Sequence, residues 1–149
     1  MIPKSTEASD IYSLVNLIIA QVEAFDASGA WPDVEHVLLV GVGDNFAAMK
    51  GADGAPWPPR KDNAEHPLLR LTRAMYGAAT EPGAAGHISA ASAEALKTGI
   101  DIGAIRYARA QNLGYAPHNL PPREFMYASD EIVGKIQTIL WNAAAEQIF

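Results

Sequence analysis

The spacing of apolar residues predicts a long helix near the start of the chain. From Ser9 to Ser28 the apolar side chains recur every three or four residues, which places them on one face of a helix: Ile11, Leu14, Val15, Ile18, Val22 and Phe25. Further apolar residues give this helix a second apolar side, so we expect more than one neighbour to cover it, and another subunit is a candidate. The Ser28-Gly29 pair is expected to end the helix.

A second helix is predicted from Pro32 to about Lys50. Proline suits the first helical position, and Asp33 and Glu35 lie near the positive end of the helix dipole. The glycines that follow Lys50 break the pattern. The expected core face of this helix comprises Val34, Val37, Leu38, Gly41 and Asn45.

The segment 56–61 cannot be helical, because each of its prolines holds the preceding residue in an extended conformation. We expect an ordered loop that is anchored by Trp57. Residues 67–76 then predict a short third helix, with Gly77 just past its end.

Two strands and two helices are predicted in the second half of the chain. Alternating apolar and polar residues indicate strands at 86–92 and 96–102, joined as a hairpin across Ala93-Glu94. A helix at 105–113 and a loop at 115–122 follow. Ser129 is expected to cap the last helix, whose buried stripe comprises Ile132, Ile136, Ile139, Leu140 and Ala143.

These elements predict an α+β fold of four to five helices and a small antiparallel sheet, with the N-terminal and C-terminal helices packed together. The chain has 149 residues, which favours a single domain over 1–149 that buries roughly 70% of the surface of its unfolded form. Cysteine is absent, so packed apolar side chains must hold the fold without disulfides or a thiolate metal site.

Charge and hydropathy narrow the classes of partner. The net charge is −6 and the 11 lysines and arginines are scattered, which argues against specific nucleic-acid binding. No run approaches the ~20 consecutive apolar residues of a membrane span, and the first residues lack the pattern of a signal peptide. We therefore expect no membrane partner and a protein that stays in the cytoplasm where it is made.

Candidate chemistry is sparse. The run Gly41-Val42-Gly43 suggests a dinucleotide fingerprint, but that motif needs a glycine where Phe46 stands and a strand before it. The alternative is that Gly41 and Gly43 let their helix approach a neighbour closely. The four histidines lack metal-binding spacings, and neither a G-x-S-x-G serine nor a cysteine nucleophile is present. We predict no catalytic, cofactor-binding or metal-binding residues.

Two stiff, proline-framed segments are candidates for binding a partner. Trp57 stands between prolines, and a rigid loop can present an aromatic ring at little entropic cost. Pro121 to Phe125 is similar, with an arginine before an aromatic ring. The alternative for Trp57 is that it packs on its own domain; for the second segment, that Phe125 fills the core while Arg123 pairs with an acid.

Taken in order, these segments resemble the phage virion morphogenesis family of tail completion proteins. The family shows an Asn-Phe pair at a helix end, an acidic-Gly-x-x-Trp-x-Pro turn, a Pro-Leu-Leu helix start, a Tyr-Ala pair before an amide-rich turn, and Pro-x-Arg-x-Phe before the last helix. The matching residues are Asn45-Phe46, Asp53 to Pro59, Pro67-Leu68-Leu69, Tyr107 to Gly114 and Pro121 to Phe125. The resemblance covers about residues 34–140.

The resemblance implies a structural protein of a tailed bacteriophage that forms an oligomeric ring between the capsid neck and the tail tube, in the host cytoplasm during assembly and then in the virion. Its partners would be copies of itself and the tail tube and neck proteins. Departures from the family at Thr72, Gln111 and Glu124 leave open another neck, tail terminator or baseplate role, and a small enzyme is a further alternative. The interface candidates are Trp57, Pro58, Pro59, Arg60, Tyr107, Pro121, Arg123 and Phe125.

Overall fold

A computed structural model describes residues 19–148 except 21, 60 and 62–72. Within these residues the fold is α+β, as predicted, with four α-helices, two 3₁₀ helices and a two-stranded antiparallel sheet. The elements follow the order η1 (Ser28–Ala30), α2 (Trp31–Ala48), α3 (Ala74–Thr80), β1 (His87–Ala91), β2 (Leu96–Ile100), α4 (Ala108–Leu113), η2 (Ala116–His118) and α5 (Asp130–Ile148).

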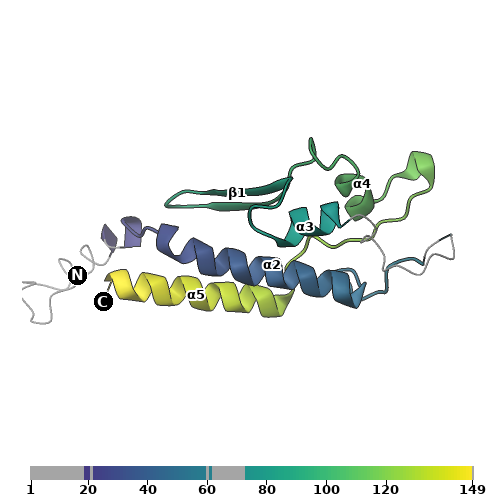
Figure 1. Ribbon diagram of the computed structural model, residues 1–149. Coiled ribbons are helices and arrows are strands. Elements are labelled where there is room, and N and C mark those ends of the chain that lie inside the picture. Colours follow the sequence, from purple (N-terminus) through teal and green to yellow (C-terminus); the bar gives the residue numbers. More distant parts are fainter. Residues whose placement is uncertain (1–18, 21, 60, 62–72, 149) are drawn as a thin grey trace, which may run out of the picture.

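The first and last α-helices of the described part, α2 and α5, lie side by side and antiparallel (Figure 1), so the N-terminal and C-terminal helices of this part pack together as predicted. Gly41 makes the close approach possible, because a Cβ atom at this position would lie 2.9 Å from Cγ1 of Ile132 on α5. A Cβ at Gly43 would instead lie 3.8 Å from the Tyr76 hydroxyl, which is an ordinary contact. The predicted reason for a glycine in this helix is therefore confirmed at Gly41.

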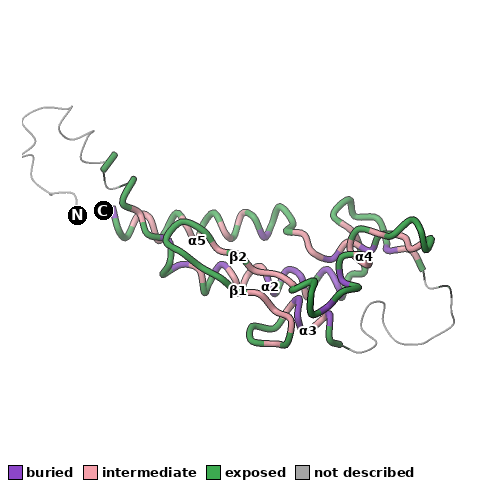
Figure 2. Tube along the Cα trace, turned by 90° about the horizontal axis from the view of Figure 1, so that it is seen from above, coloured by how far each residue is buried: buried purple, intermediate pink, exposed green. Residues whose placement is uncertain are grey.

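The opposite side of α2 carries α3 and the hairpin, and the main core lies between these layers (Figure 1, Figure 2). Ala78 and Ala79 of α3 are fully buried there, since their small side chains let α3 approach α2. The other members of this core are Met75, also on α3, and six residues from other segments: Val42, Phe46, Trp57, Ile105, Ala108 and Phe125.

The predicted helix over Ser9 to Ser28 ends earlier than expected, and its residues up to 18 lie outside the described part. The last helical residues are Val22 and Glu23. The Asp26 carboxylate then accepts hydrogen bonds from the backbone N–H and hydroxyl of Ser28, and the chain turns into η1. A local side-chain turn has thus replaced the last helical turn.

Two further boundaries were wrong. Gly77 lies inside α3, because burial against α2 carries the helix on to Thr80, where Pro82 stops it. The residues 67–72 of that predicted helix lie outside the described part. The helix predicted from Ile105 begins at Ala108, since the chain first makes a turn in which the Asp101 carboxylate accepts the N–H of Gly103.

Local signals placed the hairpin and the last helix correctly. The strands pair from His87 with Ile100 to Ala91 with Leu96, so the turn spans Ala93-Glu94 as predicted. Ser129 caps α5 by accepting the N–H of Ile132 at 3.3 Å. Of the predicted stripe, Ile132 is buried and its other four members are partly buried. The predicted loop at 115–122 includes the short helix η2.

Candidate functional site

The residues that carry the family resemblance meet around Phe46, near the end of α2. The Phe46 ring packs edge-on against Trp57, with centroids 5.9 Å apart, and tilted against Phe125 at 4.9 Å. Tyr76 of α3 adds a second edge contact at 5.1 Å. Phe46 and Phe125 are the largest fully buried side chains among the described residues. This aromatic packing therefore joins segments up to about 80 residues apart in sequence.

Two asparagines fix the backbone that follows Phe125. The amide of Asn45 donates to the carbonyl oxygens of Phe125 and Tyr127 at 2.9 and 3.0 Å. The side-chain oxygen of Asn112 accepts the N–H groups of Phe125 and Met126 at 2.9 and 3.0 Å. An asparagine amide can satisfy both kinds of backbone group without charge. The amides of Asn45 and Asn112 thus have a structural use, whereas the buried Oε1 of Gln111 has no hydrogen-bond partner among the described residues.

Arg123 and Trp57 join the two proline-framed segments. Arg123 donates from Nε to the carbonyl of Pro58 at 3.0 Å and from Nη2 to that of Pro59 at 3.1 Å. In return, the Trp57 indole N–H donates to the carbonyl of Glu124 at 3.0 Å. The planar guanidinium can bond neighbouring carbonyls together. Residues 57–59 and 123–125 therefore form one unit, which we call the proline clamp.

The interface candidates fall into three groups. Trp57 is 6% exposed, Arg123 is buried and Phe125 is fully buried, so for Trp57 and Phe125 the structure bears out the alternative of packing within their own domain. Arg123 bonds backbone carbonyls, which neither reading of the sequence included. Arg60 lies outside the described residues. The remaining four candidates are accessible to solvent at least in part. Pro58 and Pro121 are partly exposed, and Pro59 and Tyr107 are exposed.

The most exposed large apolar side chain of the described residues was absent from the sequence prediction. Trp141 on α5 is 73% exposed. It lies nine residues after Ile132, or about 180° around the helix, and so points away from α2. Val133 is exposed within a quarter turn of it. We call the side of α5 that bears Val133 and Trp141 the Trp141 face; a helical projection could have found it.

A second group of exposed apolar side chains lies around α4. They belong to the segment 102–115, which also contains two exposed arginines and no acidic residue. The Tyr115 ring stacks on His118 with centroids 5.2 Å apart, which fixes one end of the segment. The exposed apolar residues are Ile102, Tyr107, Leu113 and Tyr115.

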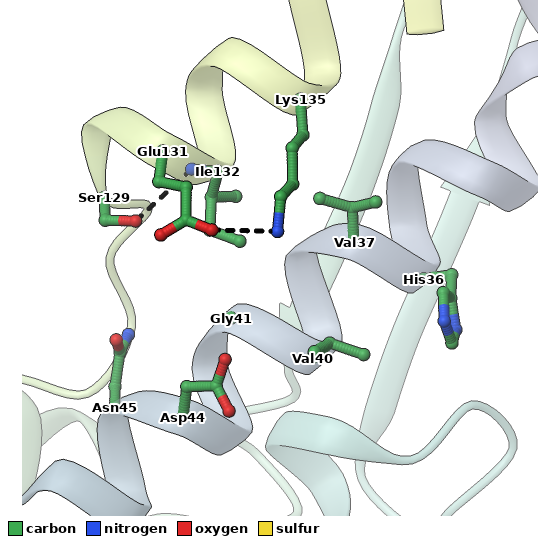
Figure 3. Close-up of a pocket in the computed structure, with 10 residues that line it drawn as sticks. All are labelled: His36, Val37, Val40, Gly41, Asp44, Asn45, Ser129, Glu131, Ile132 and Lys135. Carbon is green, nitrogen blue, oxygen red and sulfur yellow. Dashed lines mark hydrogen bonds and ion pairs between the residues drawn. The ribbon is translucent and has the colours of Figure 1, made fainter.

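A groove of about 340 Å³ runs between α2 and α5. Figure 3 shows Glu131 and Lys135 reaching from α5 toward α2, joined by an ion pair of 3.0 Å, while His36 stands apart from both. The amide of Asn45, at one end of the groove, is already bonded to the backbone of Phe125 and Tyr127. The groove therefore brings together an exposed ion pair and apolar side chains but no nucleophile with an adjacent base.

A partly buried polar cluster ties the hairpin to α2. The Glu35 carboxylate accepts hydrogen bonds from Ser89 at 3.0 Å and Thr98 at 2.9 Å and contacts Nε2 of His87 at 3.2 Å. Nδ1 of His87 faces the carbonyl of Ala78 at 2.8 Å. Burial acts to raise the pKa of Glu35, but the hydrogen bonds from His87, Ser89 and Thr98 outweigh it and hold that pKa below its ordinary value.

This cluster differs from a nucleophile–base pair, because the hydroxyls of Ser89 and Thr98 both donate to the Glu35 carboxylate, and Thr98 Oγ1 lies 3.5 Å from Nε2 of His87. The His87 side chain is only 2% exposed, so a substrate would not reach it. The cluster therefore fixes the hairpin on α2. Its members come from three elements, and sequence spacing gave no signal for it.

The part of the chain that the structure describes has neither a metal-binding cluster nor a membrane-spanning helix. There, no three His, Cys, Asp or Glu side chains lie close enough together to hold a metal ion. No described helix combines the length and apolar character needed to cross a membrane. In comparisons with known proteins, no family model, curated protein or solved structure matches the chain.

Proposed function

We propose that this chain is a structural protein of a tailed bacteriophage that acts in tail completion or head–tail joining during virion assembly. The observation that carries the proposal is that the segments of the family resemblance bond to one another. Asn45-Phe46, the Trp57 turn, the Gln111-Asn112 turn and the Arg123 to Phe125 segment contact one another around Phe46. The side chains of these segments pack together or bond the backbone. The motifs are therefore explained by a structural role and need no catalytic one.

The surface supports an assembly role. Tryptophan, tyrosine and arginine supply much of the binding energy of protein interfaces. Trp141 is exposed on α5, while Tyr107 and Tyr115 are exposed around α4. A ring of identical subunits with heterologous contacts needs two different complementary patches on each copy. Two separate groups of exposed apolar side chains meet that need.

In this role the chain forms an oligomeric ring between neck and tail tube. It assembles in the host cytoplasm and remains in the virion, with the tail tube and neck proteins as its other partners. The net charge of −6 suits a joint past which DNA must slide, because like charges do not adhere.

The proposal is tested by locating the chain in purified virions of the phage that encodes it. Quantitative peptide mass spectrometry should detect it at far fewer copies than the tail tube protein, and gold-labelled antibody should mark the head-proximal end of the tail. Antibody pre-absorbed with the purified chain is the control. Absence from both virions and isolated tails, or labelling of the distal tail tip alone, would contradict the proposal.

A further inference from the structure

The described part of the chain begins with an exposed apolar helical stretch. Residues 19, 20, 22 and 23 are helical and all of them are exposed, with Ile19 at 48% and Val22 at 55%. In both views this stretch lies beyond η1, at the end of the molecule where α5 finishes, and leads away from α2 and α5 (Figure 1, Figure 2). The other described elements therefore leave Ile19 and Val22 in contact with water.

The sequence before Ile19 continues the same apolar pattern. Residues 9–18 lie outside the described part, so their pattern is taken from the sequence alone. Between Ser9 and Phe25 the charged residues are Asp10 and Glu23, and the apolar residues predict a helix with two apolar sides. As a helix, this segment of 17 residues would be about 25 Å long. It needs a long apolar surface to cover it.

The groove between α2 and α5 provides such a surface. A second hollow, of about 520 Å³, continues it along α5, and we call the two together the α2–α5 groove. The groove follows α5 from Ser129 to Ile139, which is about 15 Å along the helix axis. The second hollow is lined by Val37, Glu131, Gly134, Lys135, Thr138 and Ile139.

The α2–α5 groove has the shape and chemistry to receive a helix. A third helix can lie between two antiparallel helices and bury apolar side chains against both. Val37 and Val40 of α2 line the groove (Figure 3), and Val40 is 49% exposed. A Cβ at Gly134 would meet nothing within 4 Å, so this position leaves room for a helix to approach α5 closely. Glu131 and Lys135 pair with each other and so need no charge from the occupant.

We propose that the N-terminal segment 9–25 of one copy binds as a helix in the α2–α5 groove of a second copy of this chain. A second copy is the occupant because the described end of the segment leads away from its own groove (Figure 1), while each copy has one segment and one groove. The contact is heterologous, so a series of such contacts can close a ring. The inference rests on the proposed function only for the use of the contact, which is to join subunits in that ring.

The test uses the purified full-length chain in sedimentation velocity over a concentration series. Wild-type protein should self-associate, and the association should persist at high salt because salt does not screen apolar contacts. The double variant Ile19→Ser/Val22→Ser should weaken association about a hundredfold, since burial of each side chain contributes about tenfold or more. Both side chains are exposed in the single copy, so the fold should be retained.

Gly134→Leu tests the groove itself. The new side chain has room in the single copy but occupies the groove, so association should weaken at least about tenfold while the variant stays folded. Gln137→Leu is the matched control, because it adds the same side chain to an exposed position of α5 that does not line the groove. It should leave association unchanged. Circular dichroism checks that each variant is folded.

Mixing the variants identifies which surfaces meet. Gly134→Leu keeps an intact N-terminal segment, and Ile19→Ser/Val22→Ser keeps an open groove. Each alone should be monomeric at concentrations where an equimolar mixture forms a dimer and nothing larger. A monomeric wild-type protein, unchanged association in either variant, equal loss in Gln137→Leu, or no dimer in the mixture would overturn the inference. Location of the chain in virions is measured separately, so the proposed function can stand if this contact fails.

Discussion

Two glycines on α2 should respond in opposite ways to the same substitution. Gly41 and Gly43 are both interior positions of one helix, so replacing either with alanine gains about 1 kcal/mol of helix propensity. The surroundings differ. A Cβ at Gly41 would lie 2.9 Å from Cγ1 and 3.0 Å from Cδ1 of Ile132, whereas a Cβ at Gly43 has nothing closer than 3.8 Å.

The magnitude follows from these distances. Moving Ile132 from 2.9 Å to an ordinary contact of at least 3.4 Å requires a shift of about 0.5 Å, and Cγ1 is too near its own backbone to swing aside. Overpacking of this kind costs about 1–3 kcal/mol. Gly43→Ala should therefore raise the free energy of unfolding by up to about 1 kcal/mol, while Gly41→Ala leaves it unchanged or lowers it by up to about 2 kcal/mol.

Urea denaturation followed by far-UV circular dichroism measures both variants. The propensity gain cancels in their difference, so Gly43→Ala should be more stable than Gly41→Ala by about 1–3 kcal/mol at unchanged m-value. Ile132→Ala, which removes the obstructing atoms, should cost less in the Gly41→Ala background than in wild type. Equal stability of the two glycine variants, or an equal cost of Ile132→Ala in both backgrounds, would refute the close approach of α2 and α5.

Three further predictions concern the proline clamp, the Phe125 backbone and the Glu35 cluster. Arg123→Ala should lower the free energy of unfolding by about 2–4 kcal/mol in the same assay, because charged hydrogen bonds to two carbonyls are lost, whereas exposed Arg109→Ala should change it by less than about 0.5 kcal/mol. Asn112→Ala should cost about 2 kcal/mol, because two backbone N–H groups lose their acceptor; amide hydrogen exchange should locate the loss at Phe125 and Met126. The pKa of Glu35 is lower in the folded protein than its ordinary value of 4.5. Its contribution to the free energy of unfolding is therefore fully present above pH 4.5 and is lost as the pH falls through the folded pKa. Glu35→Gln should therefore weaken the fall of unfolding free energy at low pH, and Glu94→Gln should leave that fall in place. An unchanged fall in Glu35→Gln would contradict the role of the cluster.

The sequence predicted those elements whose signals are local. Ser129 marked the start of α5 because a cap needs only the next three residues, and the hairpin followed from alternation on both sides of Ala93-Glu94. Gly77 was misplaced because its helix is extended by burial of Ala78 and Ala79 against α2, which no local pattern reveals. Boundaries set by tertiary packing thus differed from those set by propensity.

The candidate site shows the same division. An aromatic residue between prolines is equally compatible with a buried and an exposed ring, and only the position of Phe46 shows that Trp57 turns inward. The pairing of Glu35 with His87 spans 52 residues and could not be read from spacing. Trp141 could have been found, because its place opposite the Ile132 stripe follows from helical periodicity alone.

The most direct test of the assembly role is electron microscopy of lysates from the encoding phage with this gene deleted. We expect filled or empty heads and separate tails that are unjoined or of abnormal length, no plaques, and restoration by the wild-type gene supplied in trans. Normal, infectious virions in the absence of this protein would contradict the account.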